Sequence, residues 1–330
     1  MRILILSDAD VHRALAPEAC EHAMAAVLAA HARGEAYVPL RTVMVPPGAP
    51  GFMGLMPAYA SGGEPEGSFA VKSICLMPGN PGRGLDTHQG TVTLFSGETG
   101  VPVAILNASA VTEIRTAAVT AAATRALAAA DSRVLAILGS GVQGRSHLHA
   151  LDGVRDWAEV RIYSPHPGHA QAAADAARAR GDSVVTVAAS ARQAIEGADV
   201  VVTATTAREP VLEHGWLRPG AHVNAVGAST PSAWEIDVAT VAAAALFCDN
   251  RDSLAHEAGE FRRALQQGAI AGPGHVRAEL GEVLAGLAPG RSDGELTMFR
   301  SLGVGIEDLA AAQLALATAR EHGIGTEVEL

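Results

Sequence analysis

The second half of the chain alternates short apolar runs with longer segments in which apolar residues recur at helical spacing. The apolar runs are Arg133–Leu138, Val160–Tyr163, Val184–Val187, Val200–Ala204, His222–Val226 and Ala245–Cys248. Three helices are predicted between them. The first follows Arg133–Leu138 and ends at about Leu151, and the others span His169–Arg180 and Ala189–Ile195. Buried strands of this length that alternate with helices predict an α/β fold with a parallel, doubly wound sheet.

The first 110 residues are patterned differently, in short runs separated by glycine and proline. A strand is predicted at Arg2–Leu6, and the acidic residues that follow it mark the start of a helix over about Val11–Arg33. Further strands are predicted at Arg41–Val45, Ser68–Leu76, Gly90–Ser96 and Val101–Leu106. The pattern favours an antiparallel sheet with one packed helix.

Two more helices are predicted from long segments that lack internal breakers. Thr112–Ala130 is rich in alanine and contains no glycine or proline, and Ile306–His322 has the same character near the end of the chain. The length of 330 residues suggests about two domains.

Composition narrows the class of protein. With 48% hydrophobic and 18% charged residues, the chain can bury a sizeable core and is not a disordered protein. A formal charge of −11 without a basic block argues against nucleic acid as a partner. The longest apolar run, Val241–Cys248, is too short to span a membrane. Three cysteines at unrelated spacings fit a reducing cytoplasm, and no residues have metal-ligand spacing, so we expect a cytoplasmic protein without a metal site.

The strongest local motif is a glycine loop, Gly139-Ser140-Gly141-Val142-Gln143-Gly144, between a predicted strand and a predicted helix. In that context the glycines permit a tight turn, close approach to a pyrophosphate, and close packing of helix on strand, while the helix N-terminus offers free N–H groups. We therefore predict a dinucleotide site that includes Gly139, Gly141, Val142, Gln143 and Gly144.

The end of the second strand bears on which dinucleotide is bound. A cofactor without a 2′-phosphate usually meets an Asp or Glu there. In this chain the strand ends in Ser164-Pro165-His166, so no carboxylate repels a 2′-phosphate. Ser164 can donate a hydrogen bond and His166 can also carry some positive charge, which favours NADP(H) over NAD(H).

Taken together, the motifs resemble the ornithine cyclodeaminase/mu-crystallin family, which includes ketimine reductase and alanine dehydrogenase-like members. The matching stretches run nearly from end to end. They are Leu55-Met56-Pro57, Thr112-x-x-Arg115-Thr116-Ala117-Ala118, the glycine loop, the stretch from Pro219 to Gly227, and Ile306-Glu307-Asp308-Leu309-Ala310. The Arg115-Thr116-Ala117-Ala118 segment ahead of such a loop is specific to this family among Rossmann proteins.

The resemblance implies a Rossmann domain over 116–305 and a substrate domain made of 1–115 with 306–330, which forms a homodimer through its sheet. It also implies three cations in the substrate site, Arg41, Lys72 and Arg115. Guanidinium groups are natural clamps for the carboxylate of an amino or imino acid. Further cofactor contacts are expected from Arg115, Thr116, Thr205, Val226 and Gly227.

Two departures from the cyclodeaminase branch bear on the reaction. That branch has an acidic residue directly before Leu-Met-Pro and an aspartate two residues after the glycine that matches Gly227. Here those positions are Gly54 and Ser229. Neutral residues cannot recognise a distal ammonium in that way, which argues against ornithine as the substrate. Lys72, with a pKa depressed by neighbouring cations, is the candidate proton donor, and Ser229 could hydrogen-bond the imine nitrogen or a water.

Three functions stay open at this point. The first is an NAD(P)H-dependent reductase of an α-imino acid, which in reverse is an amino-acid dehydrogenase. The second is a lyase of the cyclodeaminase type, and the third is a non-catalytic NADP(H)-binding protein. Gly54 and Ser229 favour the first over the second, and the cations Arg41, Lys72 and Arg115 favour an enzyme over a binder.

Overall fold

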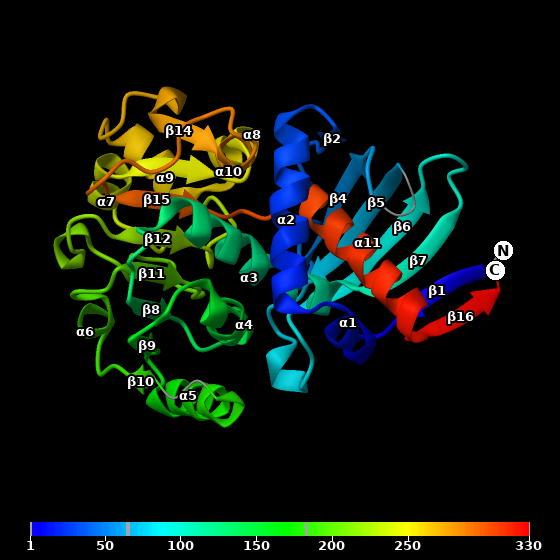
Figure 1. Ribbon diagram of the computed structural model, residues 1–330, viewed down its shortest axis with the longest axis horizontal. Helices are drawn as coiled ribbons and strands as arrows, with labels where there is room; N and C mark the ends of the chain where they lie inside the picture. Colours follow the sequence, from blue (N-terminus) through cyan, green and yellow to red (C-terminus); the bar gives the residue numbers. More distant parts are fainter. Residues whose placement is uncertain (1, 64–66, 182–183, 330) are drawn as a thin grey trace. The chain divides into compact units, whose positions relative to one another are not determined.

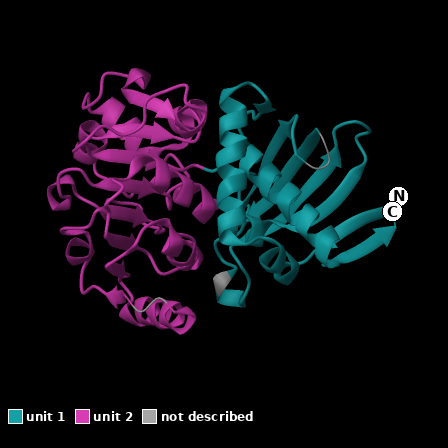
Figure 2. Cartoon of the chain, viewed as in Figure 1, with its two compact units in different colours: residues 1–115, 303–330 teal, residues 116–302 magenta. Residues whose placement is uncertain are grey.

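The computed structural model describes residues 2–63, 67–181 and 184–329 and divides into two compact units (Figure 2). Unit 1 consists of Met1–Arg115 and Gly303–Leu330, and unit 2 of Thr116–Leu302. The first boundary lies between Arg115 and Thr116. The chain returns to unit 1 at Gly303, slightly before the expected residue 306.

Unit 1 is built on a sheet with the strand order β16-β1-β7-β6-β5-β4-β2, in which β3 also pairs with β4 (Figure 1). Its strands are β1 (Arg2–Leu6), β2 (Ala36–Tyr37), β3 (Thr42–Met44), β4 (Phe52–Ala60), β5 (Ser68–Leu76), β6 (His88–Ser96), β7 (Pro102–Asn107) and β16 (Thr326–Glu329). The prediction of an antiparallel sheet was wrong for one pair, because β1 runs parallel to β7. Strands β2, β4 and β16 were not predicted.

The predicted helix Val11–Arg33 is two helices, α1 (Asp8–Ala14) and α2 (Pro17–Ala32). The break is caused by Pro17, because the residue before a proline is pushed out of the helical region. Ala16 is accordingly extended, with φ −69° and ψ 138°, and Pro17 takes the first position of α2. A third helix, α11 (Gly305–His322), packs against α2 and against strands β4, β5 and β6.

Both long helices of unit 1 lie along one face of its sheet (Figure 1). Side chains of β5 alternate accordingly, since Ser68, Ala70 and Lys72 are buried while Phe69 is half exposed. On the other face Tyr59 packs beside Phe69, with 4.7 Å between ring centroids. Unit 1 therefore has one sheet face covered by helices and one that carries the half-exposed Phe69 beside Tyr59.

Unit 2 contains a sheet with the order β10-β9-β8-β11-β12-β15-β13-β14, and every pairing in it is parallel. Its strands are β8 (Val134–Leu138), β9 (Glu159–Tyr163), β10 (Val185–Val187), β11 (Val200–Thr203), β12 (His222–Ala225), β13 (Ala245–Cys248), β14 (Val276–Glu279) and β15 (Thr297–Arg300). The predicted doubly wound α/β fold is confirmed, although β14 and β15 were not predicted. The strand order reverses direction at β8 and β11, which is where such sheets bind ligands.

Helix α3 (Ala108–Leu127) begins in unit 1 and ends in unit 2. The other helices of unit 2 are α4 (Val142–Ala150), α5 (Pro167–Arg180), α6 (Ala191–Ile195), α7 (Val238–Ala243), α8 (Arg251–Glu257), α9 (Gly259–Gln266) and α10 (Leu280–Leu284). Short 3₁₀ turns occur at Pro81–Arg83, Asp152–Val154, His214–Trp216 and Pro273–His275. Among the described residues, no helix combines the length and apolar character needed to cross a bilayer.

Candidate functional site

The glycine loop lies between β8 and α4, at the point where the strand order of unit 2 reverses. Gly139 has φ +114°, and a Cβ there would clash with the backbone of Ala204, at the end of β11. A Cβ at Gly144 would clash with the carbonyl of Gly139, whereas one at Gly141 would meet open space. Two glycines are thus required by the fold, and the third leaves room for a ligand, as a dinucleotide cradle needs.

The start of α4 is suited to an anion. Gly141 is the N-cap residue and makes no side-chain cap bond, and the backbone N–H groups at a helix N-terminus favour a bound anion. Farther along α4, His147 is fully buried and hydrogen-bonds the carbonyl of Gln143 through Nδ1 at 2.7 Å and Thr120 Oγ1 through Nε2 at 2.9 Å. Burial lowers the pKa of His147 to about 4, so the neutral ring ties the loop's helix to α3.

The end of β9 carries the residues that bear on cofactor choice. Ser164 is buried, and its hydroxyl accepts a hydrogen bond from the backbone N–H of His166 at 3.3 Å. The His166 side chain is exposed beside His169, with 5.3 Å between ring centroids. The backbone N–H of Gly139 donates to the Tyr163 carbonyl at 2.8 Å, so the glycine loop and the end of β9 are joined directly.

In unit 1 the predicted cations Lys72 and Arg115 come together around one carboxylate. Lys72 lies in the middle of β5 and is 2% exposed. Its Nζ lies 2.8 Å and 2.9 Å from the two Asp308 oxygens and donates to Thr112 Oγ1 at 3.3 Å. Arg115, near the middle of α3, donates from Nε to Asp308 at 3.0 Å and from Nη1 to Glu307 at 2.7 Å.

The third predicted cation, Arg41, is held by a backbone contact. Its Nη2 donates to the carbonyl of Gly303 at 2.8 Å, which places Arg41 where α11 is about to begin. All three predicted cations are therefore held by groups at or just before the first turn of α11, and we name Arg41, Lys72 and Arg115 the cation cluster.

Burial sets the protonation behaviour of this cluster. Burial lowers the pKa of Lys72 to about 8, with Asp308 opposing the shift and the charges of Arg115 and Arg41 adding to it. Burial alone would raise the pKa of Asp308, but the charges of Lys72 and Arg115 outweigh it, so the pKa lies below its usual value. The site thus holds an ionised carboxylate against a lysine that can change its charge near neutral pH.

Glu307 and Asp308 belong to the motif Ile306–Ala310, but the sequence predicted no role for either of them. Their position in the first turn of a predicted helix was a local signal, because the helix dipole stabilises carboxylates there. What the sequence could not supply was their contact with β5 and α3. Within unit 1, His88 was also overlooked; burial lowers its pKa, and the charges of Lys72 and Arg115 lower it further.

The other predicted residues lie on further elements of the two units. Ser229 is exposed on the loop after β12 and belongs to unit 2. Gly54 lies on β4, opposite Ile74 of β5, and a Cβ there would make only an ordinary contact. Thr205 and Gly227 lie just after β11 and β12, next to the buried Val226 in the case of Gly227, and Thr116 is a buried residue of α3.

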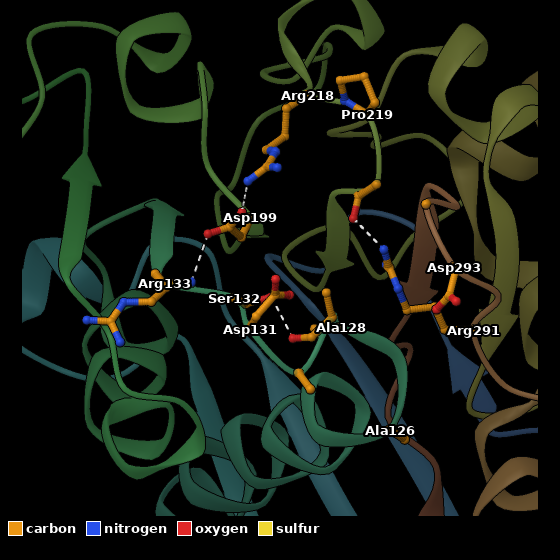
Figure 3. Close-up of a pocket in the computed structure, with 14 residues that line it drawn as sticks. Ala126, Ala128, Asp131, Ser132, Arg133, Asp199, Arg218, Pro219, Arg291 and Asp293 are labelled. Carbon is orange, nitrogen blue, oxygen red and sulfur yellow. Dashed lines mark hydrogen bonds and ion pairs between the residues drawn. The ribbon is translucent and has the colours of Figure 1, made fainter.

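A pocket of about 810 Å³ lies at the edge of the unit 2 sheet that is opposite the glycine loop (Figure 3). It is lined by residues that precede β8, β11, β12 and β15, whereas ligands of such sheets bind beyond the carboxyl ends of the strands. Arg218 pairs with Asp199, which also accepts the backbone N–H of Arg133 at 2.8 Å, and Arg291 donates to the Gly220 carbonyl at 2.9 Å. This pocket is therefore separate from the glycine loop.

Comparisons with known proteins give matches that extend over both units. The model of the ornithine cyclodeaminase/mu-crystallin family matches residues 1–323. The ketimine reductase mu-crystallin of Mus musculus is 37% identical over 276 residues, which cover 84% of this chain and 83% of that protein. The alanine dehydrogenase of Archaeoglobus fulgidus is 33% identical over 332 residues, covering 100% of this chain and 99% of its own length.

A solved structure is also closely similar. It is that of Thermococcus litoralis Delta(1)-pyrroline-2-carboxylate reductase in complex with NADH and L-proline. It is 35% identical to this chain, superposes with a TM-score of 0.94, and covers 99% of this chain and 100% of its own.

Proposed function

Because the chain belongs to the ornithine cyclodeaminase/mu-crystallin family, we propose that it is an NAD(P)H-dependent reductase of an α-imino acid, and in reverse an amino-acid dehydrogenase. The observation that carries the proposal is the buried Lys72, held by Asp308 beside Arg115. Relatives named as reductases of ketimines and of pyrroline-2-carboxylate support the reaction class.

Different residues of the chain bind the substrate and supply the proton in this reaction. Arg115 and Arg41 bind the carboxylate of the imino acid, which orients the C=N carbon. The reduced nicotinamide, when bound at the glycine loop, supplies a hydride to that carbon. Lys72 gives its proton to the nitrogen as the C=N double bond becomes a single bond, so the imine gains one hydride and one proton. Asp308 keeps the Lys72 ammonium in place for this transfer.

The cyclodeaminase and pure binding functions are the alternatives, and a spectrophotometric panel separates all three. NADPH and NADH are each mixed with pyrroline-2-carboxylate, piperideine-2-carboxylate, or pyruvate plus ammonia or methylamine, with ornithine plus NAD⁺ as the control. We expect loss of absorbance near 340 nm with at least one imine. Proline and ammonia from ornithine without imine reduction would show a lyase, and binding without turnover would show the third function.

We further propose that NADP(H) is preferred, because Ser164 and His166 leave the end of β9 without a carboxylate. Relatives in solved structures hold NADH or NAD, so the opposite preference is the natural competing result.

Replacing Ser164 with aspartate is expected to shift the ratio of kcat/KM toward NADH by about tenfold, equal to ~1.4 kcal/mol. The reason is repulsion between the new carboxylate and the 2′-phosphate. The measurement is steady-state kinetics with both cofactors and one imine, and Ser164→Asn is the uncharged control. An unchanged ratio in Ser164→Asp would contradict NADP(H) recognition at this strand end.

We also propose that unit 1 forms a homodimer through the sheet face that carries Phe69, which is 50% exposed, and Tyr59. A bare apolar sheet face favours pairing with a second copy. One relative is described as an alanine dehydrogenase dimer with bound NAD.

Phe69→Asp is expected to convert the dimer to a monomer at micromolar concentration, since it puts a charge in the apolar contact. Light scattering after size exclusion measures the mass. Leu287→Asp, at a residue of unit 2 that is 63% exposed, is the control and should leave the dimer intact. A wild-type monomer, or a dimer unaffected by Phe69→Asp, would rule out this face.

A further inference from the structure

Glu235 is a carboxylate buried beneath two loops of unit 2, with 1% of the residue exposed. Its Oε1 accepts the backbone N–H of Thr205 at 2.6 Å, in the loop after β11. Its Oε2 accepts the backbone N–H groups of Gly227 at 2.7 Å and Ala228 at 3.2 Å, in the loop after β12. The Thr203 hydroxyl lies 3.1 Å from Oε2. One carboxylate therefore joins the ends of two neighbouring strands.

The partners of Glu235 determine which form of the carboxyl group suits the site. Three of them are backbone N–H groups, which can only donate, and the Thr203 hydroxyl can donate as well. Burial raises the pKa of Glu235, while the hydrogen bonds from Thr205 and Thr203 and the charge of Arg300 oppose that rise. The arrangement of donors thus selects the anion, and an amide at this position would turn an NH₂ group toward other donors.

The segment that carries Glu235 is itself fixed. The backbone carbonyl of Glu235 accepts the N–H groups of Val211 at 2.8 Å and Leu212 at 3.1 Å. Leu212 also forms a bridge with Ile236. The carboxylate consequently extends from an anchored backbone toward Thr205, Gly227 and Ala228.

The two loops approach each other closely where Glu235 joins them. A Cβ on Gly227 would clash with the backbone of Thr205 and lie 2.7 Å from Glu235 Oε1. On the other side, the carbonyl of Ala204 bounds the space beside Gly139. A shift of the loop after β11 would therefore disturb both the Gly227 loop and the turn of the glycine loop.

We propose that Glu235 is a positioning residue that holds the loops after β11 and β12 in the shape that receives the dinucleotide. The inference rests on the proposed function only in taking a dinucleotide as the ligand. Glu235 acts through the backbone of Thr205, Gly227 and Ala228, and two of these residues, Thr205 and Gly227, are expected cofactor contacts.

The test compares Glu235→Gln with the wild type by dinucleotide binding and by amide hydrogen exchange of the cofactor-free protein. We expect the Kd for NADPH and NADH, measured from nicotinamide fluorescence, to rise about tenfold or more. The amides of Thr205, Gly227 and Ala228 should exchange slowly in the wild type and faster in the variant. Asp237→Asn is the matched control, because Asp237 also accepts backbone N–H groups, from Thr240 at 3.0 Å and His214 at 3.1 Å, but accepts none from Thr205, Gly227 or Ala228.

Each outcome has a defined meaning. An unchanged Kd in Glu235→Gln, or an equal loss in Asp237→Asn, would overturn the proposal while leaving the proposed function intact. A wild type that binds no dinucleotide would overturn the proposed function and this role with it. If Glu235→Gln fails to fold, Thr203→Val removes a single donor and is expected to raise the Kd about threefold. Fast exchange of the three amides in the wild type would also overturn the proposed role of Glu235.

Discussion

Lys72→Met is expected to lower kcat for imine reduction by about 10²–10⁴-fold while leaving dinucleotide affinity unchanged. Methionine fills a similar volume on β5 but has no proton to give to the developing amine. Asp308 keeps Arg115 as its partner in the variant, so the carboxylate does not become an unpaired buried charge. The measurement is steady-state turnover with saturating imine and cofactor, together with fluorescence titration of the cofactor. Retention of most of the turnover would show that the proton comes from elsewhere.

The same assignment predicts a pH dependence with a definite sign. Since burial lowers the pKa of Lys72 to about 8, the protonated form is lost as the pH rises through that value. The rate of imine reduction should therefore fall above about pH 8, and the rate of amino-acid oxidation, which needs the neutral amine, should rise. Asp308→Asn removes the carboxylate that raises the pKa of Lys72. The pH at which imine reduction falls and the pH at which amino-acid oxidation rises should therefore both become lower.

The pKa can also be read without turnover, because Lys72 is the one lysine in the sequence. Protein made with lysine labelled with carbon-13 at Cε gives one lysine signal, whose shift follows the charge of Nζ. A titration midpoint near that of free lysine would contradict the depressed pKa and the pH profile derived from it.

Local features of the fold could be predicted, and long-range ones could not. The glycine loop, its flanking strand and helix, and the strand Ser68–Leu76 are encoded by residues next to each other in sequence. The break between α1 and α2 was also encoded, at Pro17, but was not interpreted. By contrast, β15 inserts between β12 and β13, a placement that depends on tertiary pairing.

The candidate site shows the same division. The cations could be proposed because the resemblance to the family implies them. Their anchors could not, because Asp308 contacts Lys72 from 236 positions away in the sequence. Glu235 carries no local motif at all, and its hydrogen bonds appear only in the fold, where three loop N–H groups and the Thr203 hydroxyl of β11 meet its oxygens.

Arg115→Lys is expected to raise the KM for the imino acid by about 100-fold, equal to ~2.7 kcal/mol, with a smaller fall in kcat. The two carboxylates Glu307 and Asp308 hold separate nitrogens of the Arg115 guanidinium, which fixes the plane of the head group. A planar fork can bind a substrate carboxylate while it keeps these contacts, whereas a single ammonium cannot do both. The charge is retained, so the buried carboxylates keep a cationic partner and the fold should survive.

The measurement is a comparison of KM and kcat at saturating cofactor, with thermal unfolding to verify the fold. Arg125→Lys is the matched control, because Arg125 lies on the same helix but is exposed and donates to the Gly153 carbonyl at 3.2 Å. It should leave KM unchanged. A general loss of helix stability would affect both variants. An equal rise in KM for the two would therefore contradict the binding of the substrate carboxylate by the Arg115 guanidinium. A rise confined to Arg115→Lys ties the effect to the planar head group itself.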